Sequence, residues 1–277
     1  MRAQYNEPAA ESLPAALQPL LGRTLVVVAH PDDETIVCGG LMQFMRGPCV
    51  AFATDGAPEA EFWWRKYGSR EAYARLRQHE AVSALAAVGV KQALFLREYE
   101  ASPHEFADQQ LYRVLPRAFE ELLEFSQRFH PDALLTMAYE GGHPDHDCAA
   151  FLAARLGARL QVPVFESPLY HRSNDMPHFQ EWTCDSGHSV ELEIKDEVLA
   201  RKKAMLAQYR SQFTTLSGGF RPELERFRVQ AKYDFAQPPH PGKLNYEAWE
   251  WPITPQDLCR AFQQFDSAAP SNQHTNQ

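Results

Sequence analysis

The sequence has no long hydrophobic segment. Its most apolar stretch covers residues 25–29, whereas a helix that spans a membrane needs about 20 apolar residues. The first eighteen residues include one arginine and two glutamates but no continuous apolar run, which argues against a secretory signal peptide. We therefore expect a cytoplasmic protein that is not inserted in a membrane.

Paired cysteines and a basic charge balance are also missing. The five cysteines are odd in number, widely spaced and without a CxxC motif, so we expect free, mostly buried thiols rather than a disulfide framework. The formal net charge is -9, and no run of five like charges occurs. An acidic chain gains nothing from counterion release at phosphates, which excludes nucleic acid as an expected partner. No basic amphipathic segment suggests lipid binding.

The length and the hydrophobic pattern predict an α/β protein. A chain of 277 residues, 44% hydrophobic and 23% charged, has the composition of one large globular domain. Short β-branched or apolar runs alternate with helical periods in the first half, at residues 24–29, 50–54, 93–96, 133–137 and 162–165. This alternation predicts a parallel sheet with helices on both faces, whose ligands bind beyond the carboxyl ends of the strands.

The second half is less regular. We expect antiparallel strands at residues 182–184 and 189–194, a turn at 185–188 and a long helix at 195–209. Residues 218–254 are rich in proline, glycine and aromatics and are expected to form loops over the site or over an edge. We predict one domain over residues 1–277, with a core at 22–213, an irregular C-terminal extension at 214–265 and a disordered tail at 266–277.

The first motif with chemical content is Ala-His-Pro-Asp-Asp-Glu at residues 29–34, directly after the first expected strand. Ionisable side chains at the end of a buried strand cost free energy unless they have partners or a function. A helix that starts near Pro31 places His30 and Asp33 about one turn apart, where both can bind one ion. Asp32 then points in a different direction from His30 and Asp33, but at the same end of the strand. A free carboxylate beside a metal is the arrangement that metal-assisted hydrolysis needs.

The second motif is Gly-Gly-His-Pro-Asp-His at residues 141–146, after the fourth expected strand. His143 and His146 are again three residues apart at an expected helix start, and Gly141 and Gly142 allow the backbone to turn sharply. Either motif alone could be structural, as a helix cap or a hydrogen-bonded histidine. Because both lie where the fold places its ligand crevice, together they favour a metal site.

At these two motifs the sequence resembles the LmbE-like, or PIG-L-type, family of N-acetylglucosaminyl deacetylases. The match is to the AHPDDE and HPDH motifs of that family, at residues 29–34 and 143–146. Weaker similarities are Thr-Asp-Gly at residues 54–56, Arg77 with Glu80, and the stretch at 203–212 that ends in Ser-Gln. The resemblance covers roughly residues 24–213.

The resemblance implies a Rossmann-like fold and a metal-dependent amide hydrolase that removes an N-acetyl group from an amino sugar or its conjugate. His30, Asp33 and His146 would bind Zn²⁺, and the same set of two imidazoles and one carboxylate also suits Fe²⁺ or Mn²⁺. Asp32 would be the general base for the attacking water.

The resemblance also gives roles to the remaining polar residues. His143 would stabilise the oxyanion or protonate the leaving amine, and Asp145 would orient His143. Substrate contacts are expected from Arg77, Tyr139 and Glu140. Some members of the family carry a tyrosine two residues before the first histidine of HPDH, where this chain has Gly141.

Several other residues have a simpler interpretation. Arg77 and Glu80 could form an ordinary surface ion pair on a helix. The aromatics Phe62, Trp63, Trp64 and Tyr67 are expected to be local core in preference to a platform for a sugar. Lys202 and Lys203 are expected on a solvated helix face.

Two other functions remain open at this stage. A metal-dependent phosphoesterase would need further carboxylates for a second ion about 3.5–4 Å from the first, and the chain offers Glu34, Asp55, Asp145 and Asp147. A sugar-binding protein without catalysis would have no need of the free carboxylate of Asp32. The sequence does not determine the oligomeric state or the group that carries the acetamide.

Overall fold

The computed structural model describes residues 13–96, 106–184 and 187–268. Within these residues a seven-stranded sheet has the order β3-β2-β1-β4-β5-β9-β8, and β6 and β7 form a separate hairpin. The strands are β1 (Thr24–Val28), β2 (Cys49–Phe52), β3 (Gln92–Phe95), β4 (Ala133–Met137), β5 (Val164–Ser167), β6 (Tyr170–Ser173), β7 (Met176–Phe179), β8 (Val190–Glu193) and β9 (Leu224–Val229).

Strands β1 to β5 are parallel, and the strand order reverses between β1 and β4. The chain runs outward from β1 through β2 to β3, returns to pair β4 with the other edge of β1, and continues to β5. Such a reversal opens a crevice at the carboxyl ends of the two central strands, because the loops after them run to opposite sides. Both sequence motifs follow these strands, so the fold brings them to one crevice.

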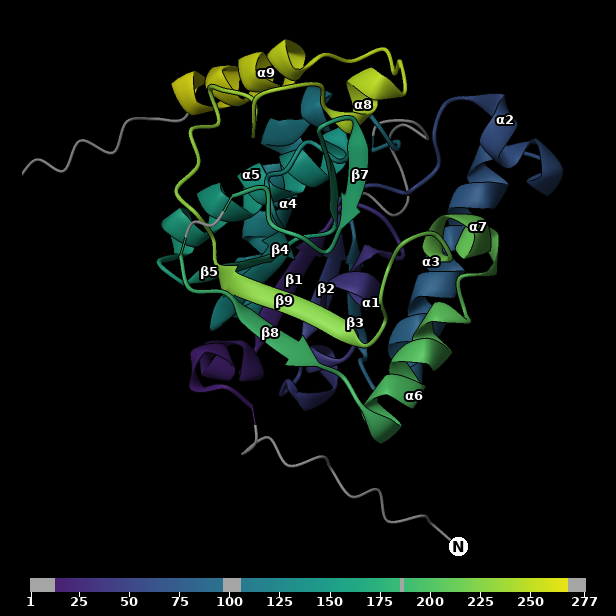
Figure 1. Cartoon of the computed structure of the whole chain (residues 1–277), viewed down its shortest axis with the longest axis vertical. Helices are drawn as coiled ribbons and strands as arrows, with labels where there is room; N and C mark the ends of the chain where they lie inside the picture. The colour runs from purple at the N-terminus through teal and green to yellow at the C-terminus, as the bar shows by residue number, and fades with distance from the viewer. Residues whose placement is uncertain (1–12, 97–105, 185–186, 269–277) are drawn as a thin grey trace, which may run out of the picture.

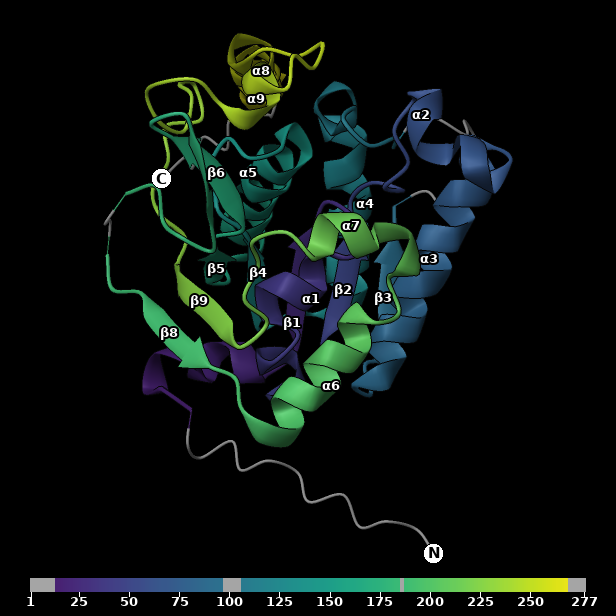
Figure 2. The same cartoon turned by 45° about the vertical axis from the view of Figure 1, so that its right-hand side comes forward.

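Helices cover both faces of the sheet (Figures 1 and 2). The helices are α1 (Asp33–Cys38), α2 (Glu61–Trp64), α3 (Arg70–Ala87), α4 (Leu115–Phe129), α5 (Pro144–Leu160), α6 (Asp196–Leu206), α7 (Phe213–Leu216), α8 (Asn245–Ala248) and α9 (Pro255–Ala268). Short 3₁₀ helices occur at η2 (Ala15–Leu21), η3 (Leu41–Phe44), η4 (Arg65–Tyr67), η5 (Leu111–Arg113) and η6 (Arg210–Gln212).

The central strands are buried on both faces, as their unbroken apolar runs predict. In β1, Val26 and Val28 pack into a core shared with α1, α3 and α6. Leu25 and Val27 point the other way, into a core shared with α4, α5 and α9. Side chains alternate between the two faces of a strand, so the four apolar residues of β1 supply both cores. The predicted α/β fold, with a mostly parallel sheet and helices on both faces, is confirmed.

The C-terminal part differs most from the sequence-based expectation. The antiparallel strand expected at residues 189–194 is present as β8, but residues 182–184 form no strand. Residues 218–254 were expected to be loops, yet they contain β9, which pairs antiparallel with β5 and β8 in the main sheet. Its alternation of apolar and charged residues was obscured by the proline, glycine and aromatic residues that follow it.

The remaining predictions have mixed outcomes. The expected disordered tail begins too early, because residues 266–268 belong to α9; residues 269–277 and the turn residues 185–186 lie outside the described residues. No disulfide joins the five cysteines, which all lie in the described residues, and only Cys184 is exposed. None of the described helices combines the length and the apolar character that crossing a bilayer requires.

Candidate metal centre

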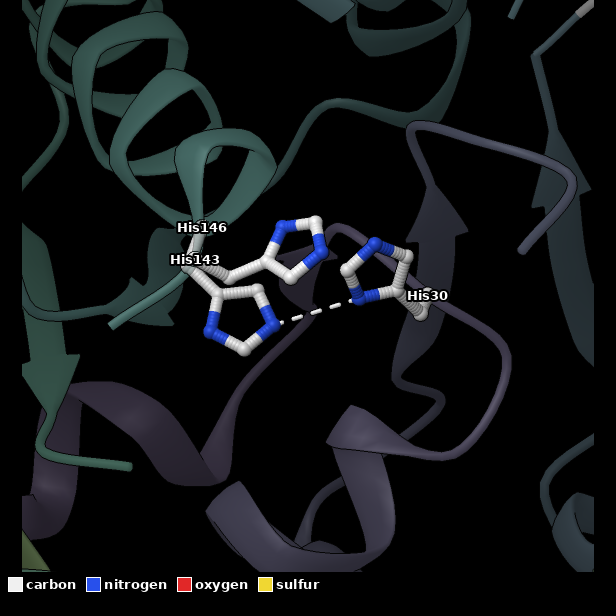
Figure 3. A group of neighbouring side chains, drawn as sticks. All are labelled: His30, His143 and His146. Atoms are coloured by element: carbon white, nitrogen blue, oxygen red, sulfur yellow. Dashed lines mark hydrogen bonds between the residues drawn. The ribbon is translucent and has the colours of Figure 1, made fainter. Parts of the chain in front are cut away.

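The two motifs meet at the carboxyl ends of β1 and β4. His30 lies in the loop after β1, while His143 and His146 lie at the start of α5 (Figure 3). Figure 3 shows the three imidazole rings turned towards one another, with a hydrogen bond between His30 Nδ1 and His146 Nε2 at 3.2 Å. All three histidines are buried.

Local capping fixes each motif. Helix α1 begins at Asp33, two residues later than expected, and the Asp33 carboxylate accepts a hydrogen bond from the His30 backbone N–H at 2.7 Å. At α5, His143 is the N-cap, its Nδ1 accepts from the Asp145 backbone N–H at 3.1 Å, and Pro144 occupies the first turn. Each helix therefore starts on a residue of its motif, which holds the side chains in fixed positions.

Three donor groups converge at the centre of the site. His30 Nδ1 is 3.2 Å from His146 Nε2 and 3.4 Å from Asp33 Oδ2, and His146 Nε2 is 3.3 Å from Asp33 Oδ1. Ligands at 2.0–2.2 Å from a tetrahedral zinc ion are about 3.4 Å apart. The spacing and the set of two nitrogens and one carboxylate therefore fit a zinc ion.

The charges in this group depend on one another. Burial alone raises the pKa of Asp33, but His146 and His30 outweigh it and hold that pKa well below its ordinary value. Burial lowers the pKa of His30, whereas Asp108 and Asp33 raise it, with a net rise well above the ordinary value. The negative carboxylates thus favour a positive charge at this position.

Asp32 is next to this group but has a different partner. Its Oδ2 accepts from Arg77 Nη2 at 2.9 Å, and both side chains are buried. Burial raises the pKa of Asp32 to about 6 although Arg77 opposes the rise. Its backbone φ of 155° lies outside the common regions for residues with a side chain.

The guanidinium of Arg77 is fixed against the loop after β2. It donates to the carbonyls of Gly56 and Pro31 as well as to Asp32. A Cβ at Gly56 would lie 2.7 Å from the guanidinium, and the φ of Gly56 is +68°. Arg77 lines the cavity, but the contacts it makes are with protein groups, so its predicted contact with substrate stays a prediction.

Asp108 was missed by the sequence analysis. Its Oδ1 is 3.2 Å from His30 Nε2 and 3.1 Å from His143 Nε2, so one carboxylate faces both histidines. A carboxylate behind a metal-binding histidine commonly fixes its ring and tautomer. Asp108 lies in the loop before η5, outside any motif, and sequence spacing gave no signal for it.

Asp145 contacts His143 mainly through its backbone, and its predicted role in orienting His143 stays a prediction. Its nearest oxygen is 4.0 Å from His143 Nδ1, and that nitrogen instead accepts from the Asp145 backbone. The carboxylate of Asp145 accepts from the backbone N–H groups of Gln109 and Leu111 at 2.6 and 3.1 Å and lies 3.4 Å from His30 Nε2. Asp145 therefore anchors the loop that carries Asp108.

Two residues with a predicted substrate contact are oriented elsewhere. Tyr139 is in the core, where its hydroxyl donates to the Gln237 carbonyl at 2.8 Å. Glu140 is fully buried and accepts from the backbone N–H groups of Leu169 and Tyr170. Neither is among the residues that line the cavity. Both follow β4 directly, and proximity in sequence to the motif suggested a role that the direction of the side chains does not support.

Other carboxylates near the site are engaged in the structure. Glu34 accepts from Thr35 and from the Tyr209 hydroxyl, each at 2.6 Å. Asp55 pairs with Arg70 at 2.7 Å. Asp147 accepts from the backbone N–H groups of residues 140 and 141.

Two further expectations about charged residues were wrong. Arg77 and Glu80 do not pair on the surface, since Arg77 binds Asp32 and Glu80 accepts from the backbone and hydroxyl of Ser211. Lys202 is fully buried and donates to Glu225 at 2.6 Å, whereas its neighbour Lys203 is exposed as expected.

The candidate metal ligands His30, Asp33 and His146 line a cavity of about 520 Å³. Its inner end carries His30, Asp32, Asp33, Arg77, Asp108, His143 and His146. The aromatic cluster after β2 is divided: Trp63 lines the cavity and is 43% exposed, Phe62 is 83% exposed, and Trp64 and Tyr67 pack on a small buried cluster. The expectation of local core is thus wrong for Phe62 and Trp63 and confirmed for the other two.

Comparison with known proteins agrees with these motifs. Residues 25–156 match the family model PIG-L, GlcNAc-PI de-N-acetylase. The chain is 29% identical over 152 residues to a probable N-acetyl-alpha-D-glucosaminyl L-malate deacetylase 2 of Bacillus cereus. It is 28% identical over 170 residues to a 1D-myo-inositol 2-acetamido-2-deoxy-alpha-D-glucopyranoside deacetylase of Corynebacterium diphtheriae. Each match covers 53% of this chain, and the chain spans 65% and 56% of the length of these two relatives.

The fold is also similar to solved structures. A triple mutant of a deacetylase of the teicoplanin biosynthetic pathway superposes with a TM-score of 0.56 at 20% identity, over 71% of this chain and 85% of that chain. At this identity the similarity concerns the fold. The two motifs and the matched family model make residues 25–156 similar to the PIG-L, or LmbE-like, family of GlcNAc-PI de-N-acetylases.

Proposed function

We propose that this protein is a zinc-dependent hydrolase that removes the N-acetyl group from an amino sugar that is part of a larger conjugate. The observation that carries the proposal is the convergence of His30 Nδ1, His146 Nε2 and Asp33 within 3.2–3.4 Å, with the Asp32 carboxylate beside them. This combination supplies three ligands for one ion and a separate base, as hydrolysis of an amide requires.

The chemistry follows from the donor set and the position of Asp32. Zinc held by His30, Asp33 and His146 would supply a Lewis acid that polarises the amide carbonyl and lowers the pKa of the attacking water. Asp32 accepts the proton from that water, and Arg77 holds the Asp32 carboxylate in position through their 2.9 Å hydrogen bond. A base with a pKa of about 6 is mostly ionised near neutral pH and still accepts a proton readily.

His143 is placed to act on the other side of the amide. Its Nε2 faces the cavity 3.1 Å from Asp108, and its Nδ1 is occupied by a backbone N–H. Because Nδ1 accepts a hydrogen bond, the ring proton is on Nε2. When Nε2 exchanges Asp108 for the substrate, it can donate to the oxyanion or transfer a proton to the departing amine. Asp108 and Asp145 together fix this arrangement.

The proposed substrate class comes from the relatives. The names of both relatives describe deacetylation of an N-acetylated glucosamine linked to a further group. An acetamido sugar presents a compact amide, which suits the polar inner end of the cavity, while the remaining cavity volume accommodates the attached group.

The competing phosphoesterase function would need two metal ions. Two groups of side chains lie close enough together to hold a cation: His30, His143 and His146, and His30, Asp108, His143 and Asp145. However, both clusters use His30, and a neutral imidazole offers one lone pair to one metal ion. Asp145 is in addition occupied by two backbone N–H groups. We therefore propose one ion per chain.

The first experiment is elemental analysis of the purified chain combined with an assay for acetate. We expect about one zinc per chain and acetate release from N-acetylglucosamine conjugates that is lost on chelation and restored by zinc. Two ions per chain with hydrolysis of a phosphoester would support the phosphoesterase. Absence of acetate release from every conjugate by zinc-loaded protein would leave a binding function.

A further inference from the structure

The cavity changes character between its inner and outer parts. The inner end is polar, whereas the outer wall is formed by Trp63, Tyr170, Phe179, Phe220, Trp249 and Trp251. Trp249 is 48% exposed although it lines the cavity, so a large apolar surface faces solvent at the opening. Exposed apolar surface around a site is typical of a place where an apolar ligand group binds.

The aromatic wall is in contact with His143 and His146 of the metal centre. The Trp251 ring lies edge-on to His143 at 4.8 Å between centroids, and Trp249 is 5.1 Å from Trp251. On the other side, Tyr170 is 5.3 Å from His146 and 6.2 Å from Trp249. A group that projects outward from a sugar at the metal centre therefore meets these rings first.

The segment that carries the two tryptophans is attached to the second motif. The Asn245 backbone N–H donates to the Gly141 carbonyl at 3.0 Å, and Leu244 packs where a Cβ on Gly141 would lie. The Asn245 side chain lines the cavity and is almost fully buried, yet its Oδ1 has no hydrogen-bond partner. An unpartnered buried carbonyl is costly in a folded protein, and a ligand hydroxyl would satisfy it.

The composition of the wall distinguishes between possible attached groups. A second sugar or a polyol needs several hydrogen-bond partners, because its hydroxyls lose water on binding. Beside the tryptophans, the wall consists mainly of the apolar residues Leu169, Pro177, Phe179, Leu216 and Phe220. Its polar lining includes Gln109, Thr215 and Gln212, and the Gln212 amide already donates to Tyr73 and Ser211. This wall favours a hydrophobic group and leaves most hydroxyls of a polar group without partners.

We infer that residues 244–251, with the facing aromatic residues, form a subsite for an apolar aglycone on the acetamido sugar. Asn245 Oδ1 accepts a hydrogen bond from a sugar hydroxyl, and Trp249 and Trp251 cover the aglycone. This inference rests on the proposed deacetylase function for the identity of the sugar. The segment lies outside residues 25–156, which match the family model.

The kinetic test compares acetate release by the full, zinc-loaded chain from four N-acetylglucosamine derivatives. These are the methyl, phenyl and octyl glycosides and N,N'-diacetylchitobiose. We expect kcat/KM for the phenyl and octyl glycosides to exceed that of the methyl glycoside about 30-fold or more, as burial of a group of this size implies. Comparison of phenyl with octyl distinguishes an aromatic from an aliphatic aglycone. Equal values for all four, or a preference for chitobiose, would overturn the inference.

The variant Trp249→Ala tests the wall directly. We expect its ratio of phenyl to methyl kcat/KM to fall about tenfold or more. The matched control is Phe213→Ala, because Phe213 is 74% exposed and does not line the cavity. The control should keep the ratio of the unmodified protein. An unchanged ratio in Trp249→Ala would contradict the proposed role of the segment.

A binding measurement separates this inference from the proposed function. Phenyl and methyl glucosides have no acetamide, so their binding, followed by tryptophan fluorescence, does not depend on turnover. Preferential binding of phenyl glucoside that Trp249→Ala abolishes, without acetate release from any derivative, would retain the subsite and refute the deacetylase. Acetate release with no preference for a phenyl over a methyl group, in either assay, would support the deacetylase and refute the subsite.

Discussion

Asp32 and Asp33 are adjacent in the chain, yet their carboxylates have opposite pKa shifts. Burial dominates at Asp32 and raises its pKa to about 6, because Arg77 only partly compensates it. Asp33 lies between His30 and His146, whose charges hold its pKa well below the ordinary value. One carboxylate is thus suited to accept a proton, and the other to remain an anionic ligand.

This difference predicts different effects of the same substitution at the two positions. Asp32→Asn removes the base but keeps an oxygen for Arg77, so we expect normal zinc content and a loss of kcat of about 10²–10⁴-fold. Asp33→Asn removes an anionic ligand, and we expect zinc to be lost together with activity. Zinc content and acetate release measured on both variants test this. Full turnover by Asp32→Asn would exclude Asp32 as the base.

At the scale of elements, β9 connects both faces of the sheet to the site. On one face, Glu225 pairs with Lys202 of α6 at 2.6 Å and accepts from the backbone N–H groups of Gly40 and Leu41 after α1. On the other, Arg228 pairs with Glu166 of β5 at 2.6 Å. Successive residues alternate between faces, so this one strand fixes α1 and the edge of the sheet together.

The buried pair of Lys202 and Glu225 predicts a large effect on stability. Lys202→Met would leave the Glu225 carboxylate buried without its cation, and we expect a loss of about 3–5 kcal/mol in the free energy of unfolding. Lys203→Met changes the exposed neighbouring residue and should have an effect within about 0.5 kcal/mol. Urea unfolding of both variants measures the difference. Similar stabilities of the two would show that the pair contributes little.

The pair of Glu166 and Arg228 predicts a dependence of stability on pH. Burial raises the pKa of Glu166 from 4.5 to about 7, although Arg228 opposes this. Between these values the native chain binds more protons than the unfolded chain, so the free energy of unfolding falls as pH rises through this window. This contribution amounts to at most about 3 kcal/mol.

Glu166→Gln removes this titration. We expect the variant to gain stability relative to the unmodified protein as pH increases from 4.5 to 7, in urea unfolding at several pH values. Glu191→Gln, which changes an exposed glutamate on β8, is the control and should show a constant difference. A constant difference for Glu166→Gln as well would contradict the raised pKa.

For the whole molecule, the site joins segments from both halves of the chain. The proposed metal ligands follow β1 and lie in the first turn of α5, and the proposed base is paired with Arg77 of α3. The outer wall combines residues from the loops after β2 and β5 and the β6–β7 hairpin with residues after 213. A bound ion would tie the loop after β1 to α5, so binding favours the folded chain over the unfolded one.

Zinc should therefore raise the thermal stability of the whole chain. At a free zinc concentration of 100 times Kd, binding adds about 2.7 kcal/mol to the stability. For a chain of this size we expect Tm to rise by roughly 5–10 °C, and to fall again on chelation. Asp33→Asn should show a much smaller rise in differential scanning fluorimetry. An equal rise in that variant would place the stabilising ion elsewhere.

The sequence by itself determined the strands of the parallel sheet and the two motifs that end them. A β-branched, mostly apolar run such as residues 24–28 is most stable as a strand that is buried on both faces. Because β1 and β4 are parallel, the loops after them bring His30 and His143 to the same edge of the sheet. These features depend on local pattern and on topology, which can be read along the chain.

Only the tertiary structure decided the remaining parts of the site. Asp108 contacts the histidines because Asp145 binds the backbone of the loop that carries Asp108. Tyr139 does not line the site, because its side chain points into the core. Trp249 and Trp251 line the cavity because Asn245 binds the Gly141 carbonyl. Such contacts join residues up to a hundred positions apart, so their spacing in the sequence carries no periodic signal that would predict them.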